Sequence, residues 1–117
     1  MLRPLLWMGS TLEELKACPS SVRQRVGYAL ELSQKGEKHD SAKPLKGFKG
    51  AGVLEIVSDF ESDTWRTINT VKIKQAIYVL HVFQKKSKSG IATPKRDLDL
   101  IHQRLKLALA HAEDEQR

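Results

Sequence analysis

The chain has 117 residues, and its 20 lysines and arginines against 14 acidic residues give it a formal net charge of +6. This length predicts one domain over residues 1–117 with one hydrophobic core, and an apolar fraction of 40% excludes extensive disorder. No apolar run reaches the roughly 18 residues of a membrane span, and the single cysteine excludes an internal disulfide, so we expect a soluble cytoplasmic protein.

The first third of the chain predicts one strand followed by two helices. LRPLLWMG at residues 2–9 has the pattern of a short strand whose proline places it at a sheet edge or a strand start. Ser10 and Glu13 have the spacing of a capping box and predict a helix to about residue 17. A second helix is expected between Pro19 and Gly36, so that the two helices form a hairpin. Its apolar face consists of Val22, Val26, Ala29 and Leu30.

The middle of the chain predicts a long loop and three strands. Residues 35–52 are polar and rich in glycine, which indicates a loop of a length that is usually functional. VLEIVSDF (53–60), TWRTINTVKI (64–73) and AIYVLHVF (76–83) have the composition of strands and short connections, so we expect an antiparallel meander. The third strand is apolar on both alternating faces, as is typical of a central strand that is covered on both sides.

A long helix is predicted at the C-terminal end. Thr93 is its expected N-cap and Pro94 its expected first helical residue. The residues expected in its buried stripe are Leu98, Ile101, Leu105, Ala108, Leu109 and Ala112. The predicted fold class is therefore α+β: a small twisted antiparallel sheet of about four strands with an N-terminal helical hairpin and a C-terminal helix.

Positive charge is concentrated in two stretches of the sequence. The first contains only two acidic residues, Glu37 and Asp40, and the second contains none. If the fold brings the two stretches together, they form one basic face. The simplest alternative is a solvated run of lysines that keeps an apolar strand in solution. The cationic residues are Lys35, Lys38, Lys43, Lys46 and Lys49 in the first stretch, and Lys85, Lys86, Lys88, Lys95 and Arg96 in the second.

Residues 84–96 are expected at the rim of the sheet, where a strand end and a helix start can meet. The free amide groups of a helix N-terminus, together with nearby lysines, suit a phosphate. Antiparallel strand order places Arg66 near residues 83–85, and an arginine can contact a phosphate at two points. The alternative partners of Arg66, in a surface ion pair, are Glu55, Glu61 and Asp63.

The histidines predict no metal site. Strand alternation places His81 on the same face as Val79 and Phe83, which favours a hydrogen-bonded, partly buried side chain over a general base. The remaining histidines lack metal-ligand spacing with a cysteine or a carboxylate, so we expect neither a metal nor a cofactor. The sequence also lacks a glycine-rich phosphate loop and a G-x-S-x-G elbow. These remaining histidines are His39, His102 and His111.

Four stretches carry a resemblance to a known family. They are KPLKGF (43–48), VLEIV (53–57), TWRTINTV (64–71) and IYVLHVFQKKSKSGIATPKRDLDLIHQRL (77–105). In these stretches the chain resembles the RelE/HigB superfamily of toxins from type II toxin-antitoxin systems, in particular its phage-derived HigB-like branch. The resemblance implies a RelE-like fold and a ribosome-dependent endoribonuclease that cleaves mRNA by metal-independent attack of the 2′-OH group. It also implies a cognate antitoxin, such as a helix-turn-helix HigA-like protein.

The same resemblance implies which residues form the site. Arg66 matches the arginine of the family's strand motif, and Lys85 and Lys86 match the basic pair after the central strand, so these three are the candidate catalytic residues. Arg66 would hold the phosphate while one of the two lysines moves a proton or stabilises charge. Two features depart from the family: Ile56 follows Glu55 where many relatives have an arginine, and no tyrosine lies near the C-terminus. The candidate RNA-binding residues are Lys43, Lys46, Lys49, Lys88, Lys95 and Arg96.

Two other functions fit the same residues. A non-catalytic module could use the basic face to bind RNA, DNA or an acidic partner, with strong salt dependence and no cleavage. A degenerate phage-derived relative could retain antitoxin binding alone.

Overall fold

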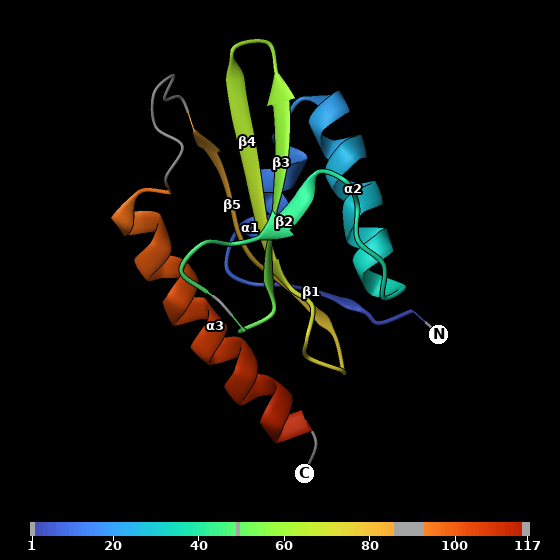
Figure 1. Ribbon diagram of the computed structural model, residues 1–117, viewed down its shortest axis with the longest axis vertical. Helices are drawn as coiled ribbons and strands as arrows, with labels where there is room; N and C mark the ends of the chain where they lie inside the picture. Colours follow the sequence, from blue (N-terminus) through green and yellow to red (C-terminus); the bar gives the residue numbers. More distant parts are fainter. Residues whose placement is uncertain (1, 49, 86–92, 116–117) are drawn as a thin grey trace.

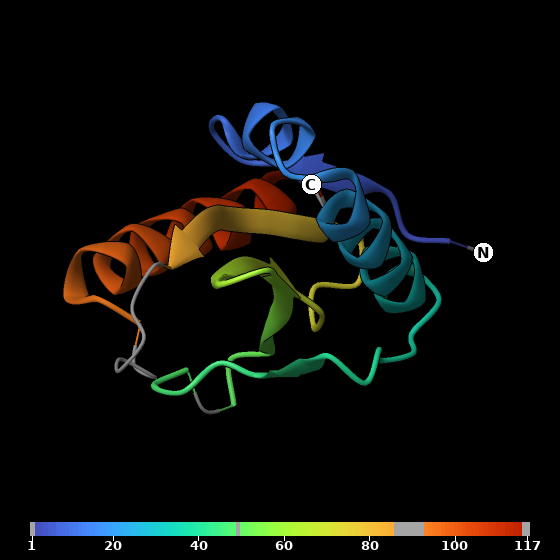
Figure 2. The ribbon, with the colours of Figure 1, turned by 90° about the horizontal axis from the view of Figure 1, so that it is seen from above.

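The computed structural model describes residues 2–48, 50–85 and 93–115. In chain order its elements are β1 (Leu5–Trp7), α1 (Thr11–Lys16), α2 (Ser20–Gln34), β2 (Ala42–Pro44), β3 (Val53–Phe60), β4 (Asp63–Thr70), β5 (Ile77–Lys85) and α3 (Lys95–Glu115). The strands form one sheet in the order β1-β5-β4-β3-β2. Figure 1 shows α2 and α3 on opposite sides of this sheet, and Figure 2 shows the same layers from above. The α+β prediction is confirmed.

The sheet is mixed rather than purely antiparallel. β3, β4 and β5 form the predicted antiparallel meander, and β1 lies at one edge, as its proline predicted, but pairs with β5 in parallel. The other edge is β2, which pairs antiparallel with β3 and lies inside the stretch predicted as a loop over residues 35–52. A strand of three residues ending in Pro44 is too short to produce an alternating pattern, and the proline suits its edge position.

β5 contains a bulge that changes which face its second half presents. Ile68 of β4 pairs with His81, whereas the next residue, Asn69, pairs with Val79, so one extra residue of β5 lies between them. A bulge of this kind shifts the alternation of side chains by one residue. His81 therefore lies on the face covered by α3, with Phe83, and not on the face of Val79. The prediction that His81 and Val79 share a face was wrong, because alternation was counted without the bulge.

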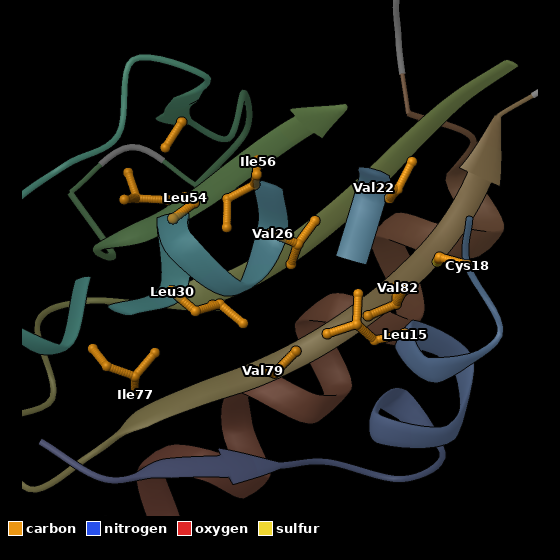
Figure 3. Packing of buried hydrophobic residues seen from close by; sticks show 12 residues of the cluster. Leu15, Cys18, Val22, Val26, Leu30, Leu54, Ile56, Ile77, Val79 and Val82 are labelled. Atoms are coloured by element: carbon orange, nitrogen blue, oxygen red, sulfur yellow. The ribbon is translucent and has the colours of Figure 1, made fainter. Parts of the chain in front are cut away.

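Two apolar clusters, one on each face of the sheet, form the core. The first packs α1 and α2 against the sheet and includes Leu30, Ile56 and Val79, as Figure 3 shows. The second packs α3 against the opposite face and includes Leu80 and Ile101. β5 contributes to both clusters, which confirms that it is a central strand covered on both sides. Every residue from Ile77 to Val82 is buried, so β5 is a rigid support for the residues that follow them.

Helix boundaries differ from the predictions in small ways. Ser10 precedes α1, but its side chain makes no capping hydrogen bond because its backbone (φ −94°, ψ 19°) lacks the extended conformation that such a cap needs. α3 starts one residue later than predicted, and the carbonyl of Pro94 accepts a hydrogen bond from the amide of Leu98 at 3.0 Å. The buried stripe of α3 is narrower than predicted, since Leu109 is 51% exposed. Leu109 is rotated by about 100° from the buried Ala108.

Candidate functional site

Four charged side chains form a row across one face of the sheet. Lys43 of β2 is the register partner of Glu55 in β3, Arg66 of β4 lies opposite Phe83, and Lys85 is the last residue of β5. Glu55, Arg66 and Lys85 lie two residues from members of the cluster under α3, so strand alternation places all three on the α3 face. The row therefore lies beyond the end of that apolar cluster, and the predicted proximity of Arg66 to Lys85 is confirmed.

A buried ion pair lies in the middle of this row. Nη1 of Arg66 donates a hydrogen bond to Oε2 of Glu55 at 2.5 Å, and the two side chains are only 10% and 4% exposed. The amino group of Lys43 lies 3.9 Å from the other carboxylate oxygen and is largely solvated. Glu55 was among the partners considered for Arg66, but the expected surface pair is a buried one. Burial makes each charge dependent on the other, because an unpaired charge in the interior is strongly destabilising.

Lys85 is an unusually buried lysine. β5 continues two residues beyond Phe83, where the strand was predicted to end, and this brings Lys85 into the protein with only 7% of its surface exposed. Burial lowers the pKa of its amino group, the nearby charge of Arg66 lowers that pKa further, and the charge of Glu55 opposes both effects. A lysine with a lowered pKa is deprotonated more often near neutral pH, which is what a proton-transferring group needs.

A hollow of about 550 Å³ opens beside this row. One wall is formed by β2 and the residues that follow it, Glu55 lies in the sheet behind, and the start of α3 forms the other wall. Lys46 lines the hollow and is exposed to solvent. The residues around the hollow are Lys43, Pro44, Leu45, Lys46, Gly47, Glu55, Thr93 and Leu98. The structure thus places the loop after α2 next to the start of α3, as expected if the two basic stretches form one face.

The other predicted site residues lie in different situations. Lys95 and Arg96 are exposed in the first turn of α3, and Lys95 forms a surface ion pair with Asp99 at 2.9 Å. Such solvated pairs contribute little to stability, so Lys95 can exchange its partner for a phosphate at small cost. The predicted residues Lys49, Lys86 and Lys88 lie outside the described residues.

A second polar pair fixes the start of α3 beside the site. Nε2 of His81 lies 2.7 Å from Oδ1 of Asp97, and both side chains are largely buried. The His81 ring also stacks on Phe83, with ring centroids 4.6 Å apart. The predicted hydrogen-bonded histidine is confirmed. Its partner, Asp97, connects β5 to the first turn of α3, which also contains Leu98, a residue that lines the hollow. Among the described residues, Nδ1 of His81 has no hydrogen-bond partner.

Replacing Asp97 with alanine should lower the free energy of unfolding by about 1.5–3 kcal/mol, because it removes a hydrogen bond to a charged group and leaves a buried imidazole unpaired. Urea denaturation followed by tryptophan fluorescence measures this change. Asp99→Ala is the matched control, since its only described pair is exposed, and it should change stability by less than about 0.5 kcal/mol. Equal effects of the two substitutions would show that the buried pair does not hold α3.

The part of the chain that the structure describes contains no group of three or more histidine, cysteine, aspartate or glutamate side chains that could hold a metal ion. Its histidines have other contacts: His111 lies 2.7 Å from the hydroxyl of Tyr78, and His102 stacks on Phe48. Within the same residues, no helix combines the length and apolar character that crossing a membrane requires. The cationic residues that line the hollow are Lys43 and Lys46, and Arg66 lies behind them in contact with Glu55, an arrangement suited to an anion.

The fold and the site define a class: small α+β proteins in which a carboxylate paired with a buried arginine lines a hollow edged by lysines. The family model described as phage derived protein Gp49-like (DUF891) matches residues 13–106, and the chain belongs to this family. The prediction of a phage-derived family is thereby confirmed. No curated protein matches the chain significantly.

Sequence reasoning did not assign a role to Glu55. The structure makes it the central residue of the row, because it contacts Arg66 and lies near Lys43 at the same time. A signal was present: Glu55 is the single charged residue within VLEIV, an otherwise apolar stretch. A carboxylate within such a buried strand indicates a specific cationic partner.

Proposed function

We propose that the protein is the toxin of a type II toxin-antitoxin module, a RelE/HigB-like endoribonuclease that cleaves mRNA on the ribosome in the cytoplasm. Membership of the Gp49-like family, a family of RelE/HigB-like toxins, supports this proposal. The observation that carries it is the burial of Lys85 with a lowered pKa next to Arg66. Burial and the charge of Arg66 together disfavour the protonated form of Lys85 more than Glu55 favours it, so a function that uses this lysine explains its position beside the Arg66–Glu55 pair.

The proposed reaction uses the nucleophile that RNA itself supplies. The 2′-oxygen attacks the neighbouring phosphorus, a 2′-O–P bond forms, the P–O bond to the next 5′-oxygen breaks, and the products are a 2′,3′-cyclic phosphate and a 5′-hydroxyl. Arg66 holds the phosphate and stabilises the charge that develops on its oxygens. Lys85 accepts the proton of the 2′-hydroxyl or returns one to the leaving oxygen, and a lowered pKa suits either step.

The hollow and its edge are the proposed path of the RNA strand. A volume of about 550 Å³ lies within the range of small-ligand sites, which suits one nucleotide of a single strand. Lys43 and Lys46 would contact backbone phosphates on one side, and Lys95 and Arg96 on the other. Lys49 and Lys88 remain proposed RNA-binding residues and Lys86 a proposed catalytic residue, as the sequence resemblance implies. The partners are the ribosome with its mRNA and a cognate antitoxin, such as a helix-turn-helix HigA-like protein.

A translation reaction reconstituted from purified components tests the function. The wild-type protein should cut the messenger only when ribosomes are present, and the fragments should carry 5′-hydroxyl ends. A messenger with a 2′-deoxynucleotide at the cut position should resist cleavage there, because it lacks the attacking oxygen. Salt-dependent binding to ribosomes or RNA without any cleavage would refute the enzyme and favour a non-catalytic binding module.

A further inference from the structure

Glu55 is the one charged residue of the row that the proposed reaction does not use. Its side chain is 4% exposed, and its two oxygens face two different cations, Arg66 at 2.5 Å and Lys43 at 3.9 Å. A carboxylate in a site for phosphate repels the substrate by charge alone. Its presence at the centre of the row therefore requires a reason beyond charge balance.

The contact with Glu55 uses only one end of the Arg66 guanidinium group. The hydrogen bond to the carboxylate comes from Nη1. Nε of Arg66 is fully buried and, among the described residues, has no hydrogen-bond partner. An arginine offers its donors as forks, and the fork that includes Nε is separate from the Nη1 donor that Glu55 occupies. Glu55 thus fixes one donor, Nη1, and leaves Nε, on the other side of the group, without a partner among the described residues.

We propose that Glu55 is a positioning residue, which holds the guanidinium group of Arg66 so that its Nε edge receives the scissile phosphate; this inference rests on the proposed function. Arg66 lies in the middle of a sheet strand, with Trp65 and Thr67 on the opposite face, so its backbone is already fixed. The side chain still has several rotatable bonds, and Glu55 restricts them before the substrate arrives. Such preorganisation favours the transition state over mere binding.

The charges of the row are compatible with this role. Lys43, Arg66 and protonated Lys85 carry three positive charges against the one negative charge of Glu55, so the site stays cationic with the carboxylate in place. Glu55 also raises the pKa of Lys85 and so opposes the effects of burial and of Arg66. Neutralising Glu55 should therefore lower the pKa of Lys85 further.

Glu55→Gln tests the proposal in the ribosome-dependent cleavage reaction, because glutamine keeps the shape of the side chain and removes its charge. We expect kcat to fall about 10- to 100-fold, while KM stays the same or decreases because a repelling charge has gone. The limb of the pH–rate profile that reports Lys85 should move to lower pH. Asp59→Asn, the same charge change at an exposed position of β3, should leave all three measurements unchanged.

The proposal is overturned if Glu55→Gln cleaves with the wild-type kcat, or if its loss appears entirely as a higher KM. A second measurement avoids dependence on catalysis. In nuclear magnetic resonance spectra, the Nε–H signal of Arg66 should shift when a short single-stranded oligodeoxynucleotide, which lacks the 2′-hydroxyl, is added. In Glu55→Gln this signal should broaden and respond less.

These two measurements separate the proposals. If the wild-type protein cleaves no messenger but its Arg66 signal responds to the probe as described, the proposed ribonuclease activity fails and the positioning role stands for anion binding. If the probe binds the wild-type protein and leaves the Arg66 signal unmoved, the positioning role fails, whatever the cleavage result. Glu55→Asp, which keeps the charge on a shorter side chain, should also lower kcat and serves if the glutamine variant does not fold.

Discussion

Replacing Arg66 with alanine should lower the free energy of unfolding by about 3–5 kcal/mol, the range found when one partner of a buried ion pair is removed. The reason is the carboxylate that remains: Glu55 is 4% exposed, and its next cation, Lys43, is 3.9 Å away on a largely solvated side chain. Substitutions of exposed residues usually change stability by less than about 0.5 kcal/mol, so an effect of this size distinguishes a buried pair from a surface one. Urea denaturation at neutral pH, followed by tryptophan fluorescence, measures it.

A double substitution provides the control for this prediction. Glu55→Leu together with Arg66→Met replaces the pair by apolar side chains of similar size and should recover most of the lost stability, because no buried charge is left unpaired. An Arg66→Ala effect below about 1 kcal/mol would mean that the pair behaves as a solvated one. The same result would remove the basis for treating Glu55 and Arg66 as one preorganised unit.

The elements that could be predicted from the sequence are those whose pattern is local. The strand over residues 53–60 agrees with β3 at both ends, because its alternation and the turn after it lie within the segment itself. The predicted start of the last helix differs from the start of α3 by only one residue, because Pro94 marks it. β2 was missed because three residues carry no period, and its existence depends on pairing with β3.

The bulge in β5 shows why the site could be predicted only in part. Nothing within AIYVLHVF marks an extra residue, which appears only in the pairing of Ile68 and Asn69 with β5. The bulge nevertheless decides that His81, Phe83 and Lys85 face α3. The position of Arg66 near Lys85 could be predicted because antiparallel order needs no side-chain detail. The contact between Glu55 and Arg66 could not, because it depends on how two side chains cross between neighbouring strands.

The site differs from the rest of the fold because it buries charged side chains, which lower the stability of the protein. Apart from His81, the other buried residues in β3, β4 and β5 are apolar or uncharged, whereas the α3 face of the same strands buries Glu55, Arg66 and Lys85. Their charges lie at the edge of a core that apolar side chains of similar size could extend. Residues that lower stability where better packing is available are those most often kept for function.

Replacing Lys85 with methionine should reduce ribosome-dependent cleavage about 10²- to 10⁴-fold, the usual contribution of a proton-transferring group. The same change should raise stability at neutral pH, because it removes a buried cation whose pKa lies below the ordinary value of 10.5. In the wild type, the unfolded chain binds more protons than the folded protein between that lowered pKa and 10.5, so wild-type stability rises with pH across this window. The advantage of the variant should therefore be largest at neutral pH and shrink toward pH 10.5.

Activity and stability measured on the same variant distinguish a functional lysine from a structural one. Replacing a structural lysine would lower both activity and stability, whereas replacing a proton-transferring lysine lowers cleavage and raises stability. Lys74→Met, an exposed lysine in the turn before β5, is the matched control and should change neither property. If Lys85→Met cleaves as the wild type does, proton transfer does not depend on Lys85, and Lys86 becomes the residue to test. If it loses stability at every pH, the lysine is held by contacts that outweigh its burial, and the burial of Lys85 no longer supports the proposed reaction.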